Sequence, residues 1–344
     1  MLAAVTSGVG EMALRQRDDP PSPGPGTVIL RPEAVGICGS DYHFFAGELS
    51  DAAGGARFPR VQGHEVAGVI TELGSGCRDE LSVGQRVAVC PISSCGQCYP
   101  CRVGRPNACD NFQLIGIHID GGLQGRLPAA QEQVFPIRAD NPSVAAMAEP
   151  LAIAVRAVRR ASVQQGEQVV VLGAGPIGQC ICLVARERGA EVLVIDVQEP
   201  RLGLSREMGA QTLVWAGRQE TVDYARDWAA PAGPPVAIDA TGVPAAVRAM
   251  VDMTASAGRA VQVGMSGDEV SLRIGSLTEK ELDLRGVSCC DSDDFAEAVR
   301  LVEGNADLLA RMISHEFTLE RAPEAIQFAI SNPTKVMKVV ILGE

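Results

Sequence analysis

Four cysteines lie close together in one segment of the sequence, at spacings that suit a metal ion. They are Cys95, Cys98, Cys101 and Cys109. Four thiolates can surround one zinc ion tetrahedrally, at about 2.3 Å each, and such a site leaves no open coordination position. We therefore expect a structural zinc that holds together a lobe over about residues 90–110. An iron–sulfur cluster or a redox pair is the alternative, but the usual cluster run ends in Cys-Pro, whereas Asp110 follows the fourth cysteine here.

A second group of metal-binding side chains is spread along the sequence. Cys38 and His64 supply a thiol and an imidazole, and Glu65 and Glu149 supply carboxylates. One thiol, one imidazole and one carboxylate would leave a coordination position open for water or substrate, as a catalytic zinc requires. Each residue alone has a structural explanation: a buried thiol, a turn histidine or a carboxylate at a helix start. Together with the glycine-rich turn described next, the set predicts a catalytic metal, and the choice between Glu65 and Glu149 stays open.

A glycine-rich turn follows an apolar strand-like run and precedes a helical pattern. Gly173, Gly175 and Gly178 form the pattern G-x-G-x-x-G. The first glycine permits a tight turn, the second lets a pyrophosphate approach the backbone, and the third lets helix and strand pack closely. Asp196 ends the next strand-like run, where a carboxylate accepts hydrogen bonds from ribose hydroxyls and repels a 2′-phosphate. The unit therefore predicts NAD binding, although Arg201 could partly offset that repulsion.

The hydrophobic pattern predicts the elements that must position these side chains. Over 27–140, short β runs are broken by glycine and proline, which is typical of a barrel-like β domain. The run 147–161 has helix formers and an apolar face. Strand and helix patterns then alternate to about residue 285, which predicts a parallel α/β sheet. A helical run at 293–304 and a strand-like run at 335–342 follow. Two domains are therefore expected, as the length also suggests.

The composition excludes several classes of protein. The chain has 344 residues and a formal net charge of −12, whereas a nucleic-acid-binding face needs a basic surplus. No apolar run approaches the roughly 18 residues of a membrane helix, so no membrane partner is expected. The first residues lack the basic start and apolar core of a signal peptide, and we expect a cytoplasmic protein. Eleven cysteines in such a chain indicate metal or redox sites more than a disulfide framework.

A series of motifs resembles the zinc-dependent medium-chain dehydrogenases, and within them the sorbitol (polyol) and threonine dehydrogenase branch. The motifs are GICGSDYH at 36–43, GHEVAG at 63–68, CGQCYPCRVGRPNAC at 95–109, EPLAIAVRAV at 149–158, VLGAGPIG at 171–178 and NPTKVMKVVI at 332–341. The resemblance implies a GroES-like catalytic domain over 1–151 and 286–344, interrupted by a Rossmann domain over 152–285. It also implies two zinc ions, one structural at the four cysteines and one catalytic at Cys38 and His64, completed by Glu65 or Glu149.

The resemblance also implies which residues act on substrate and cofactor. Zinc would acidify the substrate hydroxyl while a hydride passes to the nicotinamide. Ser40 would accept the proton, His43 would pass it to solvent, and Asp41 would orient the Cys38 loop. Glu65 or Glu149 would tune the metal and shuttle a proton. The nicotinamide is expected where strands of the parallel sheet end. The expected cofactor-binding residues are Gly173, Gly175, Pro176, Ile177, Gly178, Asp196, Arg201, Thr241, Val263, Gly264 and Met265.

The expected substrate is a small polyol or sugar whose secondary alcohol is oxidised to the ketone with NAD. A sugar-acid (aldonate) or L-threonine-type dehydrogenase is the alternative, and a non-enzymatic NADH and zinc redox sensor is a remote one. VSCC at 287–290 replaces the aromatic–basic–aromatic run usual in the branch, which removes a basic contact and favours a neutral polyol. Arg57 and Arg126 could supply such a cation from loops. The expected pocket walls are Phe44, Phe45, Phe112 and His118.

Two apolar runs near the end of the α/β region bear on assembly. The runs 258–265 and 268–275 have the pattern of edge strands. An unpaired apolar edge is usually covered, and a two-fold partner can cover it. Together with the family resemblance, this predicts a homodimer or homotetramer.

Overall fold

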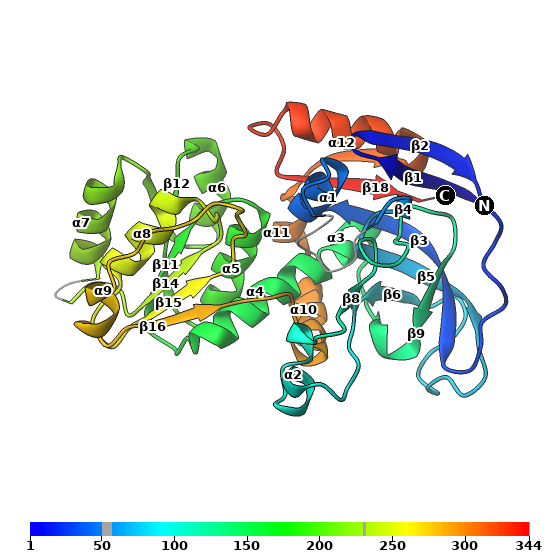
Figure 1. Ribbon diagram of the computed structural model, residues 1–344, viewed down its shortest axis with the longest axis horizontal. Helices are drawn as coiled ribbons and strands as arrows, with labels where there is room; N and C mark the ends of the chain where they lie inside the picture. The colour runs from blue at the N-terminus through cyan, green and yellow to red at the C-terminus, as the bar shows by residue number, and fades with distance from the viewer. Residues whose placement is uncertain (50–56, 230–231, 344) are drawn as a thin grey trace. The chain divides into compact units, whose positions relative to one another are not determined.

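The computed structural model describes residues 1–49, 57–229 and 232–343, which divide into two compact units (Figure 1). Unit 1 comprises Met1–Glu149 and Cys290–Glu344, and unit 2 comprises Pro150–Cys289. The sequence-based expectation places these junctions at 151/152 and 285/286. Each unit has its own hydrophobic core. Within the described residues, no helix combines the length and apolar character needed to cross a bilayer.

Unit 1 is built on a seven-stranded sheet in the order β10-β6-β5-β3-β18-β17, with β9 also paired to β3. A smaller sheet has the order β2-β1-β4. The last strand in the sequence, β18, lies between β3 and β17, so the second segment of unit 1 completes the sheet. The strands are β1 Leu2–Gly8, β2 Glu11–Gln16, β3 Thr27–Ile37, β4 Arg60–Val61, β5 Glu65–Leu73, β6 Arg86–Val89, β9 Leu127–Ala130, β10 Val134–Pro136, β17 Ile313–Thr318 and β18 Lys338–Leu342.

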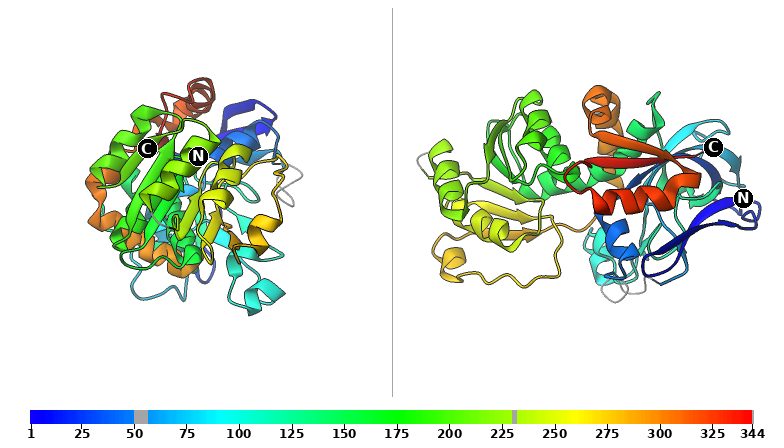
Figure 2. Two further views of the ribbon diagram at one scale, coloured as in Figure 1. Left: turned by 90° about the vertical axis from the view of Figure 1, so that its left-hand side faces the viewer. Right: turned by 90° about the horizontal axis from the view of Figure 1, so that it is seen from above.

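Short helices cover this sheet. In α12 (Ala322–Ser331) the buried residues recur at helical spacing, and Figure 2 shows α12 lying along β17 and β18. A separate lobe contains the two-stranded sheet of β7 (Ile92–Ser93) and β8 (Gln113–Leu114). The remaining helices are α1 Gly39–Phe45, α2 Tyr99–Arg102, α3 Pro142–Ala146, α10 Ser292–Gly304 and α11 Ala306–Ala310, with short 3-10 turns η1 Pro106–Ala108, η2 Gln131–Gln133 and η3 Leu319–Arg321.

Unit 2 is a parallel six-stranded sheet in the order β13-β12-β11-β14-β15-β16. Its inner strands are continuous apolar runs because helices cover both faces of the sheet (Figure 1). The strands are β11 Gln168–Leu172, β12 Glu191–Asp196, β13 Gln211–Val214, β14 Val236–Asp239, β15 Arg259–Gln262 and β16 Asp283–Gly286. The helices are α4 Ala148–Ala161, α5 Pro176–Glu187, α6 Glu199–Glu207, α7 Arg218–Trp228, α8 Pro244–Met253 and α9 Gly275–Thr278.

The strand order reverses between β11 and β14, the position where this class of sheet binds ligands. The expectation of two edge strands near the end of unit 2 was wrong. β15, within the run 258–265, is hydrogen-bonded on both sides, to β14 and β16, so its apolar character reflects burial inside the sheet. The run 268–275 forms no strand. Assembly as a homodimer or homotetramer stays a prediction, without this support.

Candidate functional site

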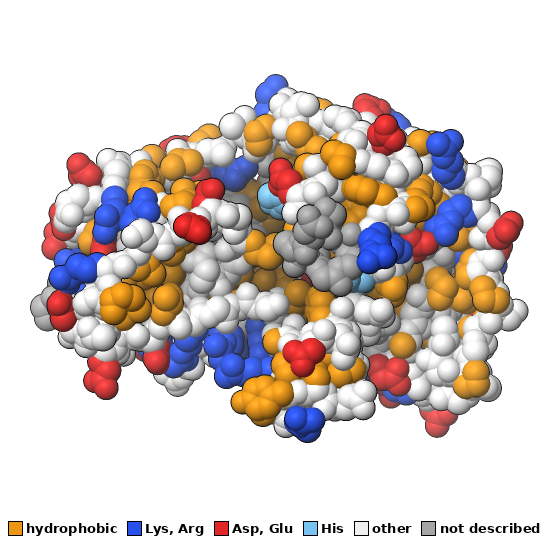
Figure 3. Space-filling model, viewed as in Figure 1, with side chains coloured by type: hydrophobic (Ala, Val, Ile, Leu, Met, Phe, Trp, Pro, Cys, Tyr) orange, Lys and Arg blue, Asp and Glu red, His pale blue; other side chains and the backbone are white. Residues whose placement is uncertain are grey.

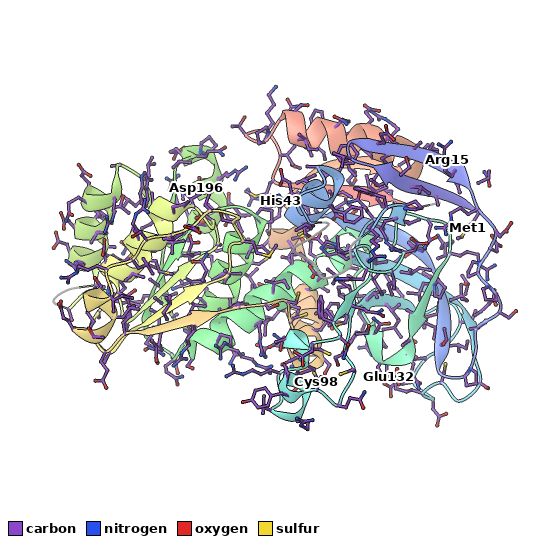
Figure 4. All side chains as sticks on the ribbon, viewed as in Figure 1. Met1, Arg15, His43, Cys98, Glu132 and Asp196 are labelled. Carbon is purple, nitrogen blue, oxygen red and sulfur yellow. The ribbon has the colours of Figure 1, made fainter. Side chains whose placement is uncertain are left out.

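The four cysteines come together in the lobe around α2, where Figure 4 labels Cys98. The Sγ–Sγ distances are 3.4 Å for Cys98–Cys101, 3.7 Å for Cys98–Cys109 and 3.5 Å for Cys95–Cys109. A tetrahedral zinc with 2.3 Å bonds places its sulfurs about 3.8 Å apart, whereas a disulfide needs about 2.05 Å. The sulfurs therefore fit one shared ion. A [4Fe–4S] cluster binds each cysteine through a different iron, and a [2Fe–2S] cluster binds two cysteines at each of two irons, so either would keep some of the four sulfurs farther apart.

The backbone around the lobe stabilises thiolates. The N–H groups of Cys95 and Asn111 donate to the Cys109 sulfur at 3.2 and 3.3 Å. Backbone hydrogen bonds from Gln97 and Cys98 lower the pKa of Cys95 to about 6. Zinc binds deprotonated thiols, so these bonds prepare the loop for a closed structural site.

Replacing Cys98 with serine should therefore remove one zinc per chain and lower the melting temperature. Each kcal/mol of lost stability lowers Tm by about 2–4 °C in a domain of this size, and a loop-closing link contributes roughly 3 kcal/mol. Metal analysis and thermal unfolding measure the two effects. Cys77→Ser is the matched control, because Cys77 lies outside both groups of metal-binding side chains among the described residues and donates to the Thr27 carbonyl. Unchanged zinc content in the Cys98 variant would contradict the assignment.

The second metal-binding group converges in unit 1. The donor atoms of Cys38, His64 and Glu65 all lie within 4.8 Å of one another. Cys38 precedes α1, and Glu65 begins β5 directly after His64, so a helix start and a strand start form the group. His64 and Glu65 are 3% and 1% exposed. A thiol, an imidazole and a carboxylate are the donors that zinc prefers, and the group therefore fits this ion.

Asp41 fixes the two segments that carry Cys38 and His64. Its carboxylate is fully buried and accepts from the backbone N–H of Cys38 at 2.9 Å and of Gly63 at 3.3 Å. It also lies 3.6 Å from Nδ1 of His64. Burial lowers the pKa of His64, but Asp41 and the Cys38 thiol together raise it well above its usual value. The sequence analysis predicts that Asp41 orients the Cys38 loop. The structure shows that Asp41 also contacts the segment that carries His64.

Glu65 is held by a buried lysine that the sequence analysis did not single out. Lys338 Nζ lies 2.7 and 2.8 Å from the two carboxylate oxygens of Glu65, and both side chains are at most 3% exposed. Although burial lowers the pKa of Lys338, the Glu65 carboxylate raises it above its usual value. Gly36 makes room for this carboxylate, because a Cβ there would lie 2.0 Å from Glu65 Oε2.

The other predicted catalytic residues take distinct positions. Ser40 Oγ lies 3.4 Å from His64 Nε2. His43 is exposed on α1, where Figure 4 labels it, and pairs with Glu48. Glu149 is buried but lies outside the three converging donors among the described residues. Burial raises the pKa of Glu149 to about 7, His64 opposes this shift, and Glu65 adds to it.

Several expected pocket residues lie elsewhere. Phe44 is buried with Ile117 in a small apolar cluster, and Phe45 is buried in the core of unit 1, so neither is an open pocket wall. Arg126 pairs with Glu72 and Asp19, which removes it as a source of positive charge for a substrate.

Phe112 and His118 face each other edge-on, with ring centroids 5.8 Å apart. His118 Nδ1 accepts the backbone N–H of Leu114 at 3.0 Å. Arg57 is exposed. These three residues stay candidates for contact with a substrate.

The glycine-rich turn has the geometry of a pyrophosphate cradle. A Cβ on Gly178 would lie 1.8 Å from the Gly173 carbonyl oxygen, which explains the close helix–strand packing. A Cβ on Gly175 would have only the Arg201 guanidinium within 4 Å, at 3.9 Å, so the backbone there is open to a ligand. Pro176 and Ile177 begin α5, whose N-terminus carries the positive end of the helix dipole.

The Asp196 carboxylate ends β12, as labelled in Figure 4, and is fixed by the backbone. It accepts the N–H groups of Ala174 at 2.6 Å and Gln198 at 2.7 Å. These two backbone N–H groups hold the Asp196 carboxylate at the edge of the cradle, where an adenosine ribose is expected.

A buried carboxylate joins the two loops expected to hold the nicotinamide. Asp239 accepts Thr241 Oγ1, the Gly242 N–H and Gln262 Nε2, each at 2.7 Å. Its carbonyl oxygen accepts the N–H groups of Val263 at 2.9 Å and Gly264 at 3.0 Å. The loops after β14 and β15 therefore form one preformed surface, with Met265 68% exposed beside it.

Replacing Asp239 with alanine should weaken NADH binding by at least about tenfold, because several buried donors lose their acceptor, which costs about 1–3 kcal/mol each. Asp239→Asn keeps one acceptor oxygen and should recover part of the affinity. Fluorescence titration with NADH measures both variants. The control is Asp268→Ala at an exposed position. Equal NADH affinity in Asp239→Ala and the wild type would contradict this role.

Comparison with known proteins shows the family to which the chain is similar over most of its length. A family model of the alcohol dehydrogenase GroES-like domain matches residues 24–139, and a model of the zinc-binding dehydrogenases matches residues 176–304. The L-galactonate-5-dehydrogenase of Escherichia coli strain K12 is 34% identical, over 96% of this chain and 96% of its own. The sorbitol dehydrogenase of Ovis aries is 32% identical, over 99% of this chain and 96% of its own.

A solved structure of a Sinorhizobium meliloti protein bound to NADP is 31% identical, with a TM-score of 0.88 over 99% of this chain and 98% of its own. The chain belongs to the zinc-dependent medium-chain dehydrogenase family. It is an enzyme, an oxidoreductase that works with a nicotinamide dinucleotide and zinc.

Proposed function

We propose that this enzyme oxidises a secondary alcohol on a small polyhydroxylated carbon chain to the ketone, with hydride transfer to NAD. The observation that carries the proposal is the convergence of Cys38, His64 and Glu65 in unit 1. This group has one thiol and one imidazole, and Glu149 adds a second buried carboxylate nearby. An oxygen-rich donor set suits a substrate that offers two adjacent hydroxyls.

The chain's own residues take these roles in the proposal. Zinc, when bound, supplies a Lewis acid that favours loss of the substrate hydroxyl proton. Cys38 and His64 hold the ion, and Asp41 holds both of their segments in place. Ser40, next to His64 Nε2, accepts the proton, and the exposed His43 passes it to solvent.

Two carboxylates are candidates for the third ligand. Glu65 lies with the thiol and the imidazole but shares both oxygens with Lys338. Glu149 is buried, and burial raises its pKa by disfavouring the charged carboxylate. A nearby metal cation would favour that charged form. Glu65→Gln and Glu149→Gln distinguish them, because only loss of the direct ligand should lower the zinc content.

The preference for NAD over NADP rests on Asp196. Its fixed charge would face a 2′-phosphate at close range, where like charges cost several kcal/mol. Replacing Asp196 with serine should lower the ratio of kcat/KM with NAD to kcat/KM with NADP by at least about tenfold. Steady-state kinetics with both cofactors measures the change. Equal use of NADP by the wild type would show that Arg201 outweighs Asp196.

An aldonate is the second candidate substrate. The similarity to a protein named L-galactonate-5-dehydrogenase favours it. A neutral polyol is favoured because Arg126 pairs with Glu72 and Asp19, which leaves the exposed Arg57 as the remaining predicted cation for a carboxylated substrate.

A panel of pentitols, hexitols, aldonates, L-threonine and simple alcohols tests the proposal, with NADH formation as the readout. Turnover of pentitols or hexitols supports the neutral polyol. Turnover of aldonates alone selects the second candidate. Turnover of primary alcohols alone overturns both.

A further inference from the structure

Unit 2 carries a basic cavity that the dehydrogenase reaction does not use. It consists of two adjoining hollows, of about 110 and 290 Å³, which share Asp252, Arg273 and Ser276. They lie against α7, α8 and the segment 271–280, and none of the residues assigned to the cofactor lines them. The basic residues lining the cavity are Arg218, Arg226, Arg248, Arg273 and Lys280. Asp252 is the one acidic side chain among the described lining residues.

The cavity has more positive charge than its neighbours neutralise. Asp252 is paired with Arg218, whose Nε donates to the Asp252 carboxylate at 2.8 Å. Arg273 donates to Ser276 at 3.3 Å and to Glu279, outside the cavity, at 2.8 Å. Arg226 and Lys280 donate to backbone carbonyls, which carry no net charge. This excess is unusual on a chain with a net charge of −12. Figure 3 shows Lys and Arg side chains on the α7 side of unit 2, interspersed with Asp and Glu side chains.

The Arg248 guanidinium has N–H donors that no described residue accepts. It is half-buried on α8 and lines the smaller hollow, and the structure gives it no hydrogen bond or ion pair with any described residue. A guanidinium offers five N–H donors in a planar fork that matches a phosphate. The pKa of Lys280 is lowered by burial and by Arg226 and Arg273, and Asp252 opposes this shift only in part.

We propose that this basic cavity binds a small ligand with at least two phosphate groups. Arg248 and Arg273 form the direct contacts, because both retain unused N–H donors. Arg226 and Lys280 contribute charge. The larger hollow approaches the volume of typical small-ligand sites. Inorganic and sugar-linked phosphates share this chemistry, and the test separates them.

Isothermal titration with inorganic pyrophosphate tests the proposal, with the enzyme saturated with NADH so that the cofactor site is closed to the probe. The wild type should bind, and Arg248→Glu with Arg273→Glu should lose at least about tenfold in affinity. Arg248→Gln is the milder variant should the double variant not fold. Arg15→Glu, an exposed change in unit 1, is the control and should bind as the wild type does. Parallel titrations with inorganic phosphate and fructose 1,6-bisphosphate show which source of phosphate fits best.

Two results would overturn the proposal. One is absence of pyrophosphate binding to the wild type, or equal loss in Arg15→Glu and in the cavity variants. The other is a wild-type oligomer, seen by light scattering, that does not bind pyrophosphate and that Arg273→Glu separates into single chains. The cavity would then be a contact between copies of the chain.

Discussion

Replacing His64 with alanine should lower kcat by at least about 10³-fold while leaving the fold and NADH binding intact. Loss of one of three protein ligands weakens or removes the ion, and a Lewis acid contributes several kcal/mol to the transition state, at about 1.4 kcal/mol for each tenfold in rate. The cofactor cradle of Gly173, Gly175 and Asp196 lies in unit 2, so its affinity for NADH should not change. Turnover, zinc content and NADH fluorescence measure the three quantities.

His315→Ala is the control for this variant. His315 lies on β17 and contacts the Phe328 ring, away from both groups of metal-binding side chains. It should keep full activity and full zinc content. The assignment of the catalytic metal is refuted by a His64 variant that retains more than a tenth of the wild-type kcat.

Replacing Lys338 with methionine should lower the free energy of unfolding by about 3–5 kcal/mol. The change leaves the Glu65 carboxylate buried without its cation, and an uncompensated buried charge is strongly destabilising. The loss should be smaller in zinc-loaded protein, because the ion offers a second partner to the same carboxylate. Urea unfolding with and without a chelator measures both values.

Two variants make this result specific. Lys335→Met removes an exposed ammonium three positions earlier and should change stability by less than about 0.5 kcal/mol. Combining Lys338→Met with Glu65→Leu removes both charges and should recover most of the loss, because apolar replacement of a buried ion pair is often neutral. A double variant as unstable as Lys338→Met alone would show that Lys338 acts through packing.

The parts of the site that depend on local spacing could be predicted from the sequence. Cys95, Cys98, Cys101 and Cys109 lie within one loop, so their spacing alone limits how far apart the sulfurs can be. The glycine-rich turn is equally local, because a strand, a turn and a helix in succession fix its geometry.

The parts that depend on distant pairing could not be predicted. Lys338 and Glu65 are 273 positions apart and meet only because β18 pairs with β3, which also pairs with β5. The prediction of Phe44 as a pocket wall is wrong because an aromatic side chain suits a cleft and a core equally well, and only the folded structure places it in a buried cluster. The apolar run of β15 was misassigned for a similar reason, since an edge strand and a fully buried strand can have the same composition.

The position of β18 has a consequence for the order in which the enzyme is made. Unit 2 is one continuous segment, whereas unit 1 needs residues from both sides of it. During synthesis on the ribosome, Cys38, His64 and Glu65 emerge long before Lys338, which neutralises Glu65. The strand that carries Lys338 is therefore made only after the whole of unit 2 has been translated. The seven-stranded sheet, and with it the ion pair of Glu65 and Lys338, can be completed only at the end of synthesis, after both segments that flank unit 2 exist.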